Sequence, residues 1–275
     1  MKQKDNVILD TDIGNSWDDQ FALVYLLKNE NLFNIEAITI EPFKHTESES
    51  VIDNQELSYN EILTISKLLN KNIENKIYKF SNNEAVEKII GIANKNDKTY
   101  ILAIGALSNI SLAINKNPNI INKIEIIWLG GNSLEYGNNK EFNFMQDTDA
   151  TFNVINSNIN MTIIPARNVA VDLIIKKEEL EKRLDMNKEI SQYLCKRFVN
   201  DSYYGVKNER VIWDISVIAY LINKNWFETK EIKGLSLSEN LQYYTNSSTA
   251  TKLIVEKLDN NKIYDDLFEV LDSVK

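Results

Sequence analysis

The 275-residue chain contains one cysteine and one histidine, and these two scarcities exclude several kinds of chemistry. Cys195 alone cannot form an internal disulfide, and a Cys-based zinc site is excluded with it. His45 is the one residue through which a Ser-His-Asp triad could act, and no nucleophile-elbow sequence accompanies it. We interpret His45 as a surface-loop residue, with a contact from a mobile lid to a substrate as the alternative.

The chain also lacks long apolar runs, basic patches and a glycine-rich phosphate loop. No apolar run approaches the roughly 20 residues that span a bilayer, and no signal-peptide pattern opens the chain. The net charge of −9 argues against a phosphate-backbone partner. We therefore expect a cytoplasmic protein in a reducing compartment that binds neither membrane nor nucleic acid.

Short apolar runs rich in Ile and Val alternate with segments of helical period. This alternation predicts an α/β fold, a doubly wound and mostly parallel sheet with a helical C-terminal part, formed by one domain over residues 1–275. The predicted strands are 6–10, 35–40, 75–80, 99–104, 124–129 and 160–165, with short strands near 230–237, 241–245 and 251–256. The predicted helices are 18–29, 54–69, 83–95, 107–116, 147–157, 177–184, 188–200, 211–223 and a last one near 260–272.

The most informative stretch is the acidic turn that follows the first predicted strand. Asp10 and Asp12 end an apolar run, and Asp18 and Asp19 open the next helix after a glycine turn. The helix dipole accounts for Asp18 and Asp19 but not for the two carboxylates before them. A hard divalent cation such as Ca²⁺ or Mg²⁺ would offset the repulsion of four acidic groups, and oxygen ligands suit it. In parallel sheets ligands lie beyond the carboxyl ends of the strands, where this turn is expected.

Two later segments carry polar residues that could lie at the same carboxyl ends of the strands. Glu141 and Asn143 alternate with two phenylalanines, so a carboxylate and an amide can face the hydroxyls of a sugar. An ordinary loop that leads into the next helix is the alternative. Trp213 and Asp214 open an apolar helix, where by themselves they would be interpreted as a core residue and a helix cap.

In this order the segments resemble the inosine-uridine-preferring nucleoside hydrolase family, from about residue 6 to about residue 223. The motifs that carry the resemblance are Asp10-Thr11-Asp12-Ile13-Gly14 with Asp18-Asp19, residues 103–109 (AIGALSN), Leu129-Gly130-Gly131, Glu141-Phe142-Asn143 and Trp213-Asp214. The resemblance implies an N-glycosidase that holds Ca²⁺ and hydrolyses ribonucleosides. It also implies a homo-oligomer, a dimer or a tetramer.

The resemblance assigns one group of residues to the metal. Asp12 would contact the metal and act as general base on its bound water, and Asp19 would be a ligand. Asp10 would be a nearby ligand or support the ligands from behind. Ile104 would offer only its backbone carbonyl, and Asp214 would bind both metal and ribose.

A second group would hold the sugar and the base. Asp18, Asn138, Glu141 and Asn143 would bind ribose hydroxyls. Many members have a histidine directly before the late aspartate, and here that residue is Trp213, as in purine-specific members that stack on the base. The resemblance thus implies that Trp213 acts in catalysis, and it makes a purine preference the expectation. Phe80 or Tyr78 could form the other side of a stack.

Three departures separate the chain from the plainest family pattern. The turn between Gly14 and Asp18 is longer by two residues, and Ser16 stands where a related branch has an aspartate. The asparagine expected after the second strand has no match near Glu41-Pro42.

Two alternative functions stay open at this point. Asp10-Thr11-Asp12 is also the mark of haloacid dehalogenase-type phosphatases, although their second acidic pair comes late in the sheet and here it follows within seven residues. A non-catalytic nucleoside- or ribose-binding homologue would fit Ser16 and the missing histidine.

Overall fold

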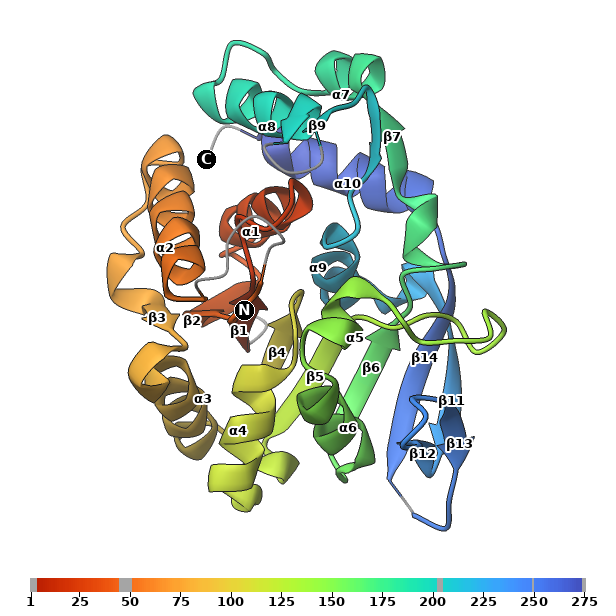
Figure 1. Cartoon of the computed structure of the whole chain (residues 1–275). Coiled ribbons are helices and arrows are strands. Elements are labelled where there is room, and N and C mark those ends of the chain that lie inside the picture. The colour runs from red at the N-terminus through yellow and green to blue at the C-terminus, as the bar shows by residue number, and fades with distance from the viewer. Residues whose placement is uncertain (1–3, 45–50, 202–204, 249, 274–275) are drawn as a thin grey trace.

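The computed structural model describes residues 4–44, 51–201, 205–248 and 250–273, and Figure 1 shows its architecture. The strands of the main sheet are β1 (Asp5–Thr11), β2 (Phe33–Ile40), β3 (Ile77–Lys79), β4 (Thr99–Ala103), β5 (Ile124–Leu129), β6 (Asn160–Ile164), β11 (Phe227–Lys233) and β14 (Thr251–Leu258). They lie in the order β11-β14-β6-β5-β4-β1-β2-β3. Every pairing is parallel except that of β11 with β14. The mostly parallel, doubly wound sheet predicted from the sequence is confirmed.

Helices cover both faces of this sheet (Figure 1). They are α1 (Asp18–Lys28), α2 (Val51–Leu68), α3 (Glu84–Lys95), α4 (Ser108–Lys116), α5 (Phe142–Gln146), α6 (Thr148–Asn156), α7 (Lys177–Arg183), α8 (Glu189–Val199), α9 (Ile215–Ile222) and α10 (Asn260–Asp272). One buried cluster joins α1, α8, α9 and α10 to one face, and a second joins α3, α4 and α6 to the other. Among the described residues, no helix combines the length and the apolar character needed to cross a membrane.

Strand side chains divide between these two clusters by the alternation of the pleat. Leu9 packs with α1 and α9, whereas its neighbour Ile8 packs in the cluster of α3 and α4. Ile127 and Trp128 divide in the same way on β5. Both faces are apolar, and burial of each such side chain stabilises the fold by about 1.5–3 kcal/mol. This is why the central strands are near-continuous apolar runs in the sequence.

The predicted boundaries differ from the observed ones where periodicity alone is ambiguous. β3 covers only Ile77–Lys79 of the predicted strand 75–80, because a 3₁₀ turn, Glu74–Lys76, occupies its beginning. The helix predicted over 211–223 begins at Ile215, after a short strand, β10 (Glu209–Val211), that pairs with β7 (Ile174–Lys176). Helix α5 was not predicted. His45 lies outside the described residues.

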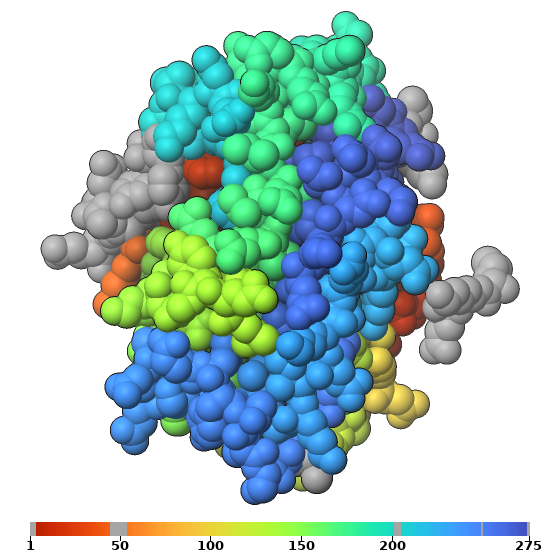
Figure 2. Space-filling view, turned by 90° about the vertical axis from the view of Figure 1, so that its right-hand side faces the viewer, coloured from red at the N-terminus to blue at the C-terminus, as the bar shows by residue number. Residues whose placement is uncertain are grey.

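Two small pairs of antiparallel strands complete the described chain. They are β12 (Leu235–Leu237) with β13 (Tyr243–Thr245), and β8 (Asn200–Asp201) with β9 (Gly205–Val206). Figure 2 shows the β12–β13 region in blue below the yellow-green loop that follows β5. A hydrogen bond from Asn139 Nδ2 to Leu241 O, 3.0 Å long, joins them. The loop after β5 is thereby held beside the carboxyl edge of the sheet.

Candidate active site

The turn between β1 and α1 is held in place by its own side chains. The Thr11 hydroxyl donates to Asp19 Oδ1 at 2.6 Å and accepts the backbone N–H of Ile13 at 3.1 Å. The Trp17 indole N–H donates to the carbonyl of Val211 at 2.9 Å, which ties the turn to the chain just before α9. Gly14 provides the left-handed conformation, with φ of 101°, that the turn requires. The longer turn is therefore an ordered structure.

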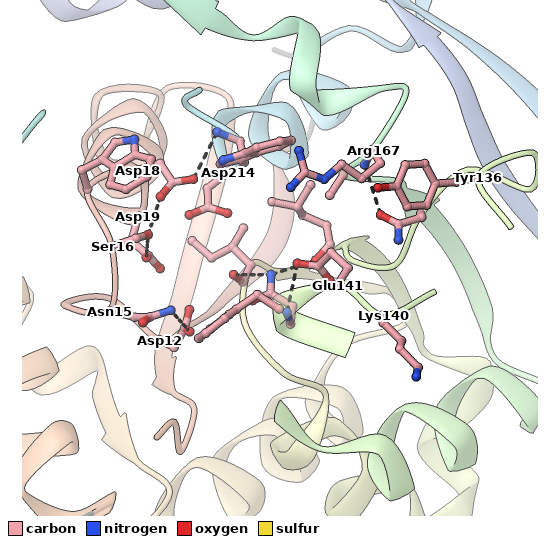
Figure 3. Close-up of a pocket in the computed structure, with 18 of the residues that line it drawn as sticks. Asp12, Asn15, Ser16, Asp18, Asp19, Tyr136, Lys140, Glu141, Arg167 and Asp214 are labelled. Carbon is pink, nitrogen blue, oxygen red and sulfur yellow. Dashed lines mark hydrogen bonds between the residues drawn. The ribbon is translucent and has the colours of Figure 1, made fainter. Parts of the chain in front are cut away.

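Three carboxylates meet where α1 and α9 begin. Asp18, Asp19 and Asp214 can each offer an oxygen within 4.8 Å of the others, and all three residues are buried. Asp18 accepts hydrogen bonds from the Ser16 hydroxyl and from the Trp213 backbone N–H, the latter at 3.1 Å. The carboxylate of Asp214 faces the pocket beside them (Figure 3). Residues almost 200 positions apart in the sequence thus form one anionic cluster.

The electrostatics of this cluster favour a cation. Burial raises the pKa of Asp19 and of Asp214 well above the usual range, and the neighbouring carboxylates raise it further. Burial also raises the pKa of Asp18 to about 6. Within the described part of the chain, no lysine or arginine forms an ion pair with any of the three. An all-oxygen donor set with uncompensated charge fits a hard divalent cation.

Asp12 lies in the same pocket but outside the group of three (Figure 3). Its Oδ2 accepts a hydrogen bond from Asn15 Nδ2 at 2.9 Å. Burial, with a contribution from Asp18, raises the pKa of Asp12 to about 7. The backbone of Gly105 approaches closely, since a Cβ there would stand 3.2 Å from Asp12 Oδ1. A carboxylate with a pKa near neutrality is suited to accept a proton from water.

Asp10 does not line the pocket. It is fully buried, and its Oδ1 accepts from the Thr39 hydroxyl at 2.5 Å and from Asn109 Nδ2 at 2.9 Å. Burial raises its pKa, and Glu41 lies beside it with its own carboxyl group on the backbone N–H of Asn109. Asp10 therefore lies behind the pocket and not at its surface.

Glu141 and Asn143 reach the pocket through the unpredicted helix α5. Glu141 caps this helix, and its carboxylate accepts the backbone N–H groups of Asn143, Phe144 and Gly131 at 3.0–3.1 Å. Asn143 Nδ2 donates to the carbonyls of Ile104 and Leu129, each at 3.0 Å. Glu141 and Asn143 therefore both shape the turn that leads into the next helix and line the cavity. The two interpretations of this segment, an ordinary loop and a sugar-binding segment, are compatible.

The cavity has a volume of about 510 Å³, which is in the range of small-molecule sites. It brings together nine of the ten residues that the family resemblance assigns to the metal, the ribose or catalysis, namely Asp12, Asp18, Asp19, Ile104, Asn138, Glu141, Asn143, Trp213 and Asp214. Tyr78 and Phe80 are not among its lining residues, so the structure does not bring the expected aromatic partner to Trp213.

Sequence reasoning missed several lining residues, among them Asn15, Tyr136, Lys140 and Arg167. Arg167 follows β6, and its guanidinium carbon stands 5.8 Å from the centre of the Trp213 ring. The position of Arg167-Asn168 at the end of a predicted strand was the one signal that could have pointed to it. Figure 3 shows Asp12, Asp18, Asp19 and Asp214 on one side of the pocket and Arg167, Tyr136 and Lys140 on the other, with Glu141 nearer the second group.

Solved structures with the same fold are nucleoside hydrolases. A plant nucleoside hydrolase superposes with a TM-score of 0.79 at 14% identity, covering 99% of this chain and 100% of that one. An inosine-uridine preferring nucleoside hydrolase from Bacillus anthracis gives 0.71 at 17%, covering 99% and 100%. A purine-preferring ribonucleoside hydrolase from Gardnerella vaginalis gives 0.76 at 17%, covering 97% and 98%. At these identities the likeness establishes the fold.

The family model described as inosine-uridine preferring nucleoside hydrolase matches residues 45–265. The chain belongs to this metal-dependent family and is an N-glycosidase. Membership of this family sets aside the phosphatase alternative.

Proposed function

We propose that the chain hydrolyses the N-glycosidic bond of ribonucleosides to free base and ribose, with Ca²⁺ as its metal and with a preference for purines. The observation that carries the proposal is the buried group of Asp18, Asp19 and Asp214 at the wall of a cavity that also contains Trp213. A calcium ion bound beside Asp19 and Asp214 would offset the repulsion of the carboxylates and supply Lewis-acid activation of a water molecule.

Asp12, Asp19 and Asp214, with the carbonyl of Ile104, are the residues that would hold the ion. Asp214 has no hydrogen-bond donor among the described residues, so its oxygens are available to a ligand. Asp18 already accepts two hydrogen bonds from Ser16 and Trp213, so we assign it to a ribose hydroxyl. Asp10 would support this layer from behind.

The chain's own residues supply the remaining parts of the reaction. Asp12, oriented by Asn15, accepts the proton of the attacking water. Glu141, Asn143 and Asn138 hold the ribose, and the buried carboxylate of Glu141 stabilises positive charge that develops on the sugar. Trp213 stacks on the departing base, a contribution of about 1–3 kcal/mol.

Turnover of nucleosides tests the proposal directly. Purified protein should release free base from inosine and adenosine, and a calcium chelator should abolish this until Ca²⁺ is restored. Asp12→Asn should lower kcat at least about 100-fold, which also excludes a contaminating hydrolase. Absence of turnover on every ribonucleoside would contradict the proposal.

The purine preference needs a separate comparison. The ratio of kcat/KM for inosine to that for uridine should exceed one, and Trp213→Ala should lower this ratio about tenfold because a purine loses more stacking area. An unchanged ratio would show that Trp213 does not contribute to the choice of base.

We also propose that the protein forms a dimer or tetramer, which analytical ultracentrifugation tests.

A further inference from the structure

Arg167 lies in a cavity lined by acids and has no ion-pair partner among the residues that the structure describes. Five carboxylates, from Asp12, Asp18, Asp19, Glu141 and Asp214, line the cavity that Arg167 also lines. Nevertheless the Arg167 side chain makes no hydrogen bond or ion pair with any described residue, and its one polar contact is with the ring of Trp213 at 5.8 Å. Its guanidinium therefore keeps its five N–H donors free for a ligand.

The backbone of Arg167 is hydrogen-bonded to the loop after β5, although its side chain has no hydrogen-bond partner among the described residues. Its N–H donates to Asn132 Oδ1 at 3.4 Å, and its carbonyl accepts from the N–H of Ser133 at 3.3 Å. The two segments form a parallel bridge beyond the ends of β5 and β6. Asn132 Nδ2 in turn donates to the carbonyl of Asn138 at 3.0 Å. Arg167 is thus positioned by the same loop that carries residues assigned to the ribose.

The geometry points to Arg167 as the residue that stabilises the leaving base, an inference that rests on the proposed function. If the sugar hydroxyls lie at Asp18 and Asp214, the base lies toward the adjacent Trp213, where the guanidinium stands. A neutral base presents nitrogen and oxygen acceptors that a planar N–H fork can contact. A phosphate dianion would instead meet the field of five carboxylates.

In this step the water oxygen bonds to the anomeric carbon, and its proton passes to Asp12. The bond from the anomeric carbon to the base nitrogen breaks, and its electron pair stays on the base. Arg167 donates hydrogen bonds to the base as this negative charge develops and remains protonated throughout. The base then takes a proton from solvent. No histidine is required for such a departure.

The test compares two leaving groups in one active site. Arg167→Met should lower kcat/KM for inosine about 10–100-fold, because a charge-assisted hydrogen bond to the developing anion is lost. For 4-nitrophenyl β-D-riboside the loss should stay under about threefold, since nitrophenolate is a stabilised anion without assistance. Arg167→Lys should restore part of the inosine activity. Lys95→Met, a charge-matched change at a side chain 72% exposed on α3, should affect neither substrate.

Each other outcome overturns the assignment. An equal loss on both substrates would show that Arg167 positions the sugar or supports the fold, and thermal unfolding would separate these two. Faster hydrolysis of inosine 5′-monophosphate than of inosine, lost in Arg167→Met, would show that the cation binds a phosphate. If the wild type cleaved the nitrophenyl riboside but no nucleoside, both this assignment and the proposed function would fail. If Arg167→Met matched the wild type on inosine, only this assignment would fail.

Discussion

Asp10 and Asp12 stand two positions apart in the sequence, yet they occupy different environments. Asp10 is enclosed by Thr39 and Asn109 within the sheet, whereas Asp12 lies past the end of β1 and lines the cavity. Burial raises the pKa of both, but only Asp12 has a route to substrate. The residue type is shared, and the environment decides the role.

A second residue whose environment shifts its pKa is Lys252, a buried lysine away from the pocket, and it should make stability depend on pH. Lys252 on β14 is 1% exposed, and its ammonium donates to the carbonyl of Ser157 at 2.9 Å. Burial lowers its pKa from 10.5 to about 8. Between these two values the unfolded chain holds a proton that the folded chain has released, so stability rises with pH.

We therefore compare wild type with Lys252→Met by urea unfolding from pH 7.5 to 10.5. The free energy of unfolding of the wild type should rise by about 2–3 kcal/mol relative to the variant across this window. Other titrating groups are common to both proteins and cancel in the difference. Parallel curves would mean that Lys252 stays charged in the folded state.

At the scale of elements, the turn after β5 requires a glycine because the Trp128 side chain packs directly against it. A Cβ on Gly130 would stand 2.1 Å from the ring of Trp128, which is fully buried. The Trp128 indole N–H donates to the carbonyl of Gly105 at 3.0 Å, beside Asp12. The ring thereby couples the two turns that form the floor of the site.

Gly130→Ala should cost about 3 kcal/mol of stability or prevent folding, because the Trp128 ring has no room to move. Gly91 in α3 is the matched control, since a Cβ there meets nothing within 4 Å. Gly91→Ala should stabilise the protein by about 0.5–1 kcal/mol. Urea unfolding of both variants measures the contrast, and similar values for the two would contradict this account.

At the scale of the whole molecule, the parallel sheet concentrates negative charge at the carboxyl ends of its strands. Strands β1, β4 and β5 and helix α9 all deliver polar groups there, and the net charge of the chain is −9. That the chain forms one domain stays a prediction. Its support is that β1, near one end of the chain, and β14, near the other, belong to the same sheet.

Calcium should therefore act on global stability. With Ca²⁺ at about 100 times its Kd, the folded state gains about 2.7 kcal/mol, which raises the Tm by roughly 5–10 °C. The effect of Asp19→Asn on stability, relative to the wild type, should depend on whether Ca²⁺ is present. Without metal the variant should be at least as stable as the wild type, because one buried repulsive charge is gone, and with Ca²⁺ it should be less stable. Calorimetry with chelator or Ca²⁺ measures both arms, and a wild-type Tm unmoved by Ca²⁺ would contradict the metal site.

Residues close together along the chain made much of the fold and part of the candidate site predictable. The β1 turn was predictable because Asp12, Asp18 and Asp19 lie within eight residues of one another, and the parallel sheet was predictable from apolar runs. Helix α5 was missed because a capping carboxylate, Glu141, holds five residues that are too few to show a helical period. The exclusion of Tyr78 from the cavity depended on where β3 ends in space.

The sequence by itself determined the alternation of strands and helices, the acidic turn and the family, because each is written in residues close together along the chain. Only the tertiary structure decided that Asp214 joins Asp18 and Asp19, and that Arg167 stands beside Trp213 with no ion-pair partner in the described part of the chain. The physical reason is that the order of the strands in the sheet decides which strands have neighbouring carboxyl ends. No local sequence pattern specifies this order. Distances across that edge, and the burial that shifts the pKa values there, arise only when the strands assemble.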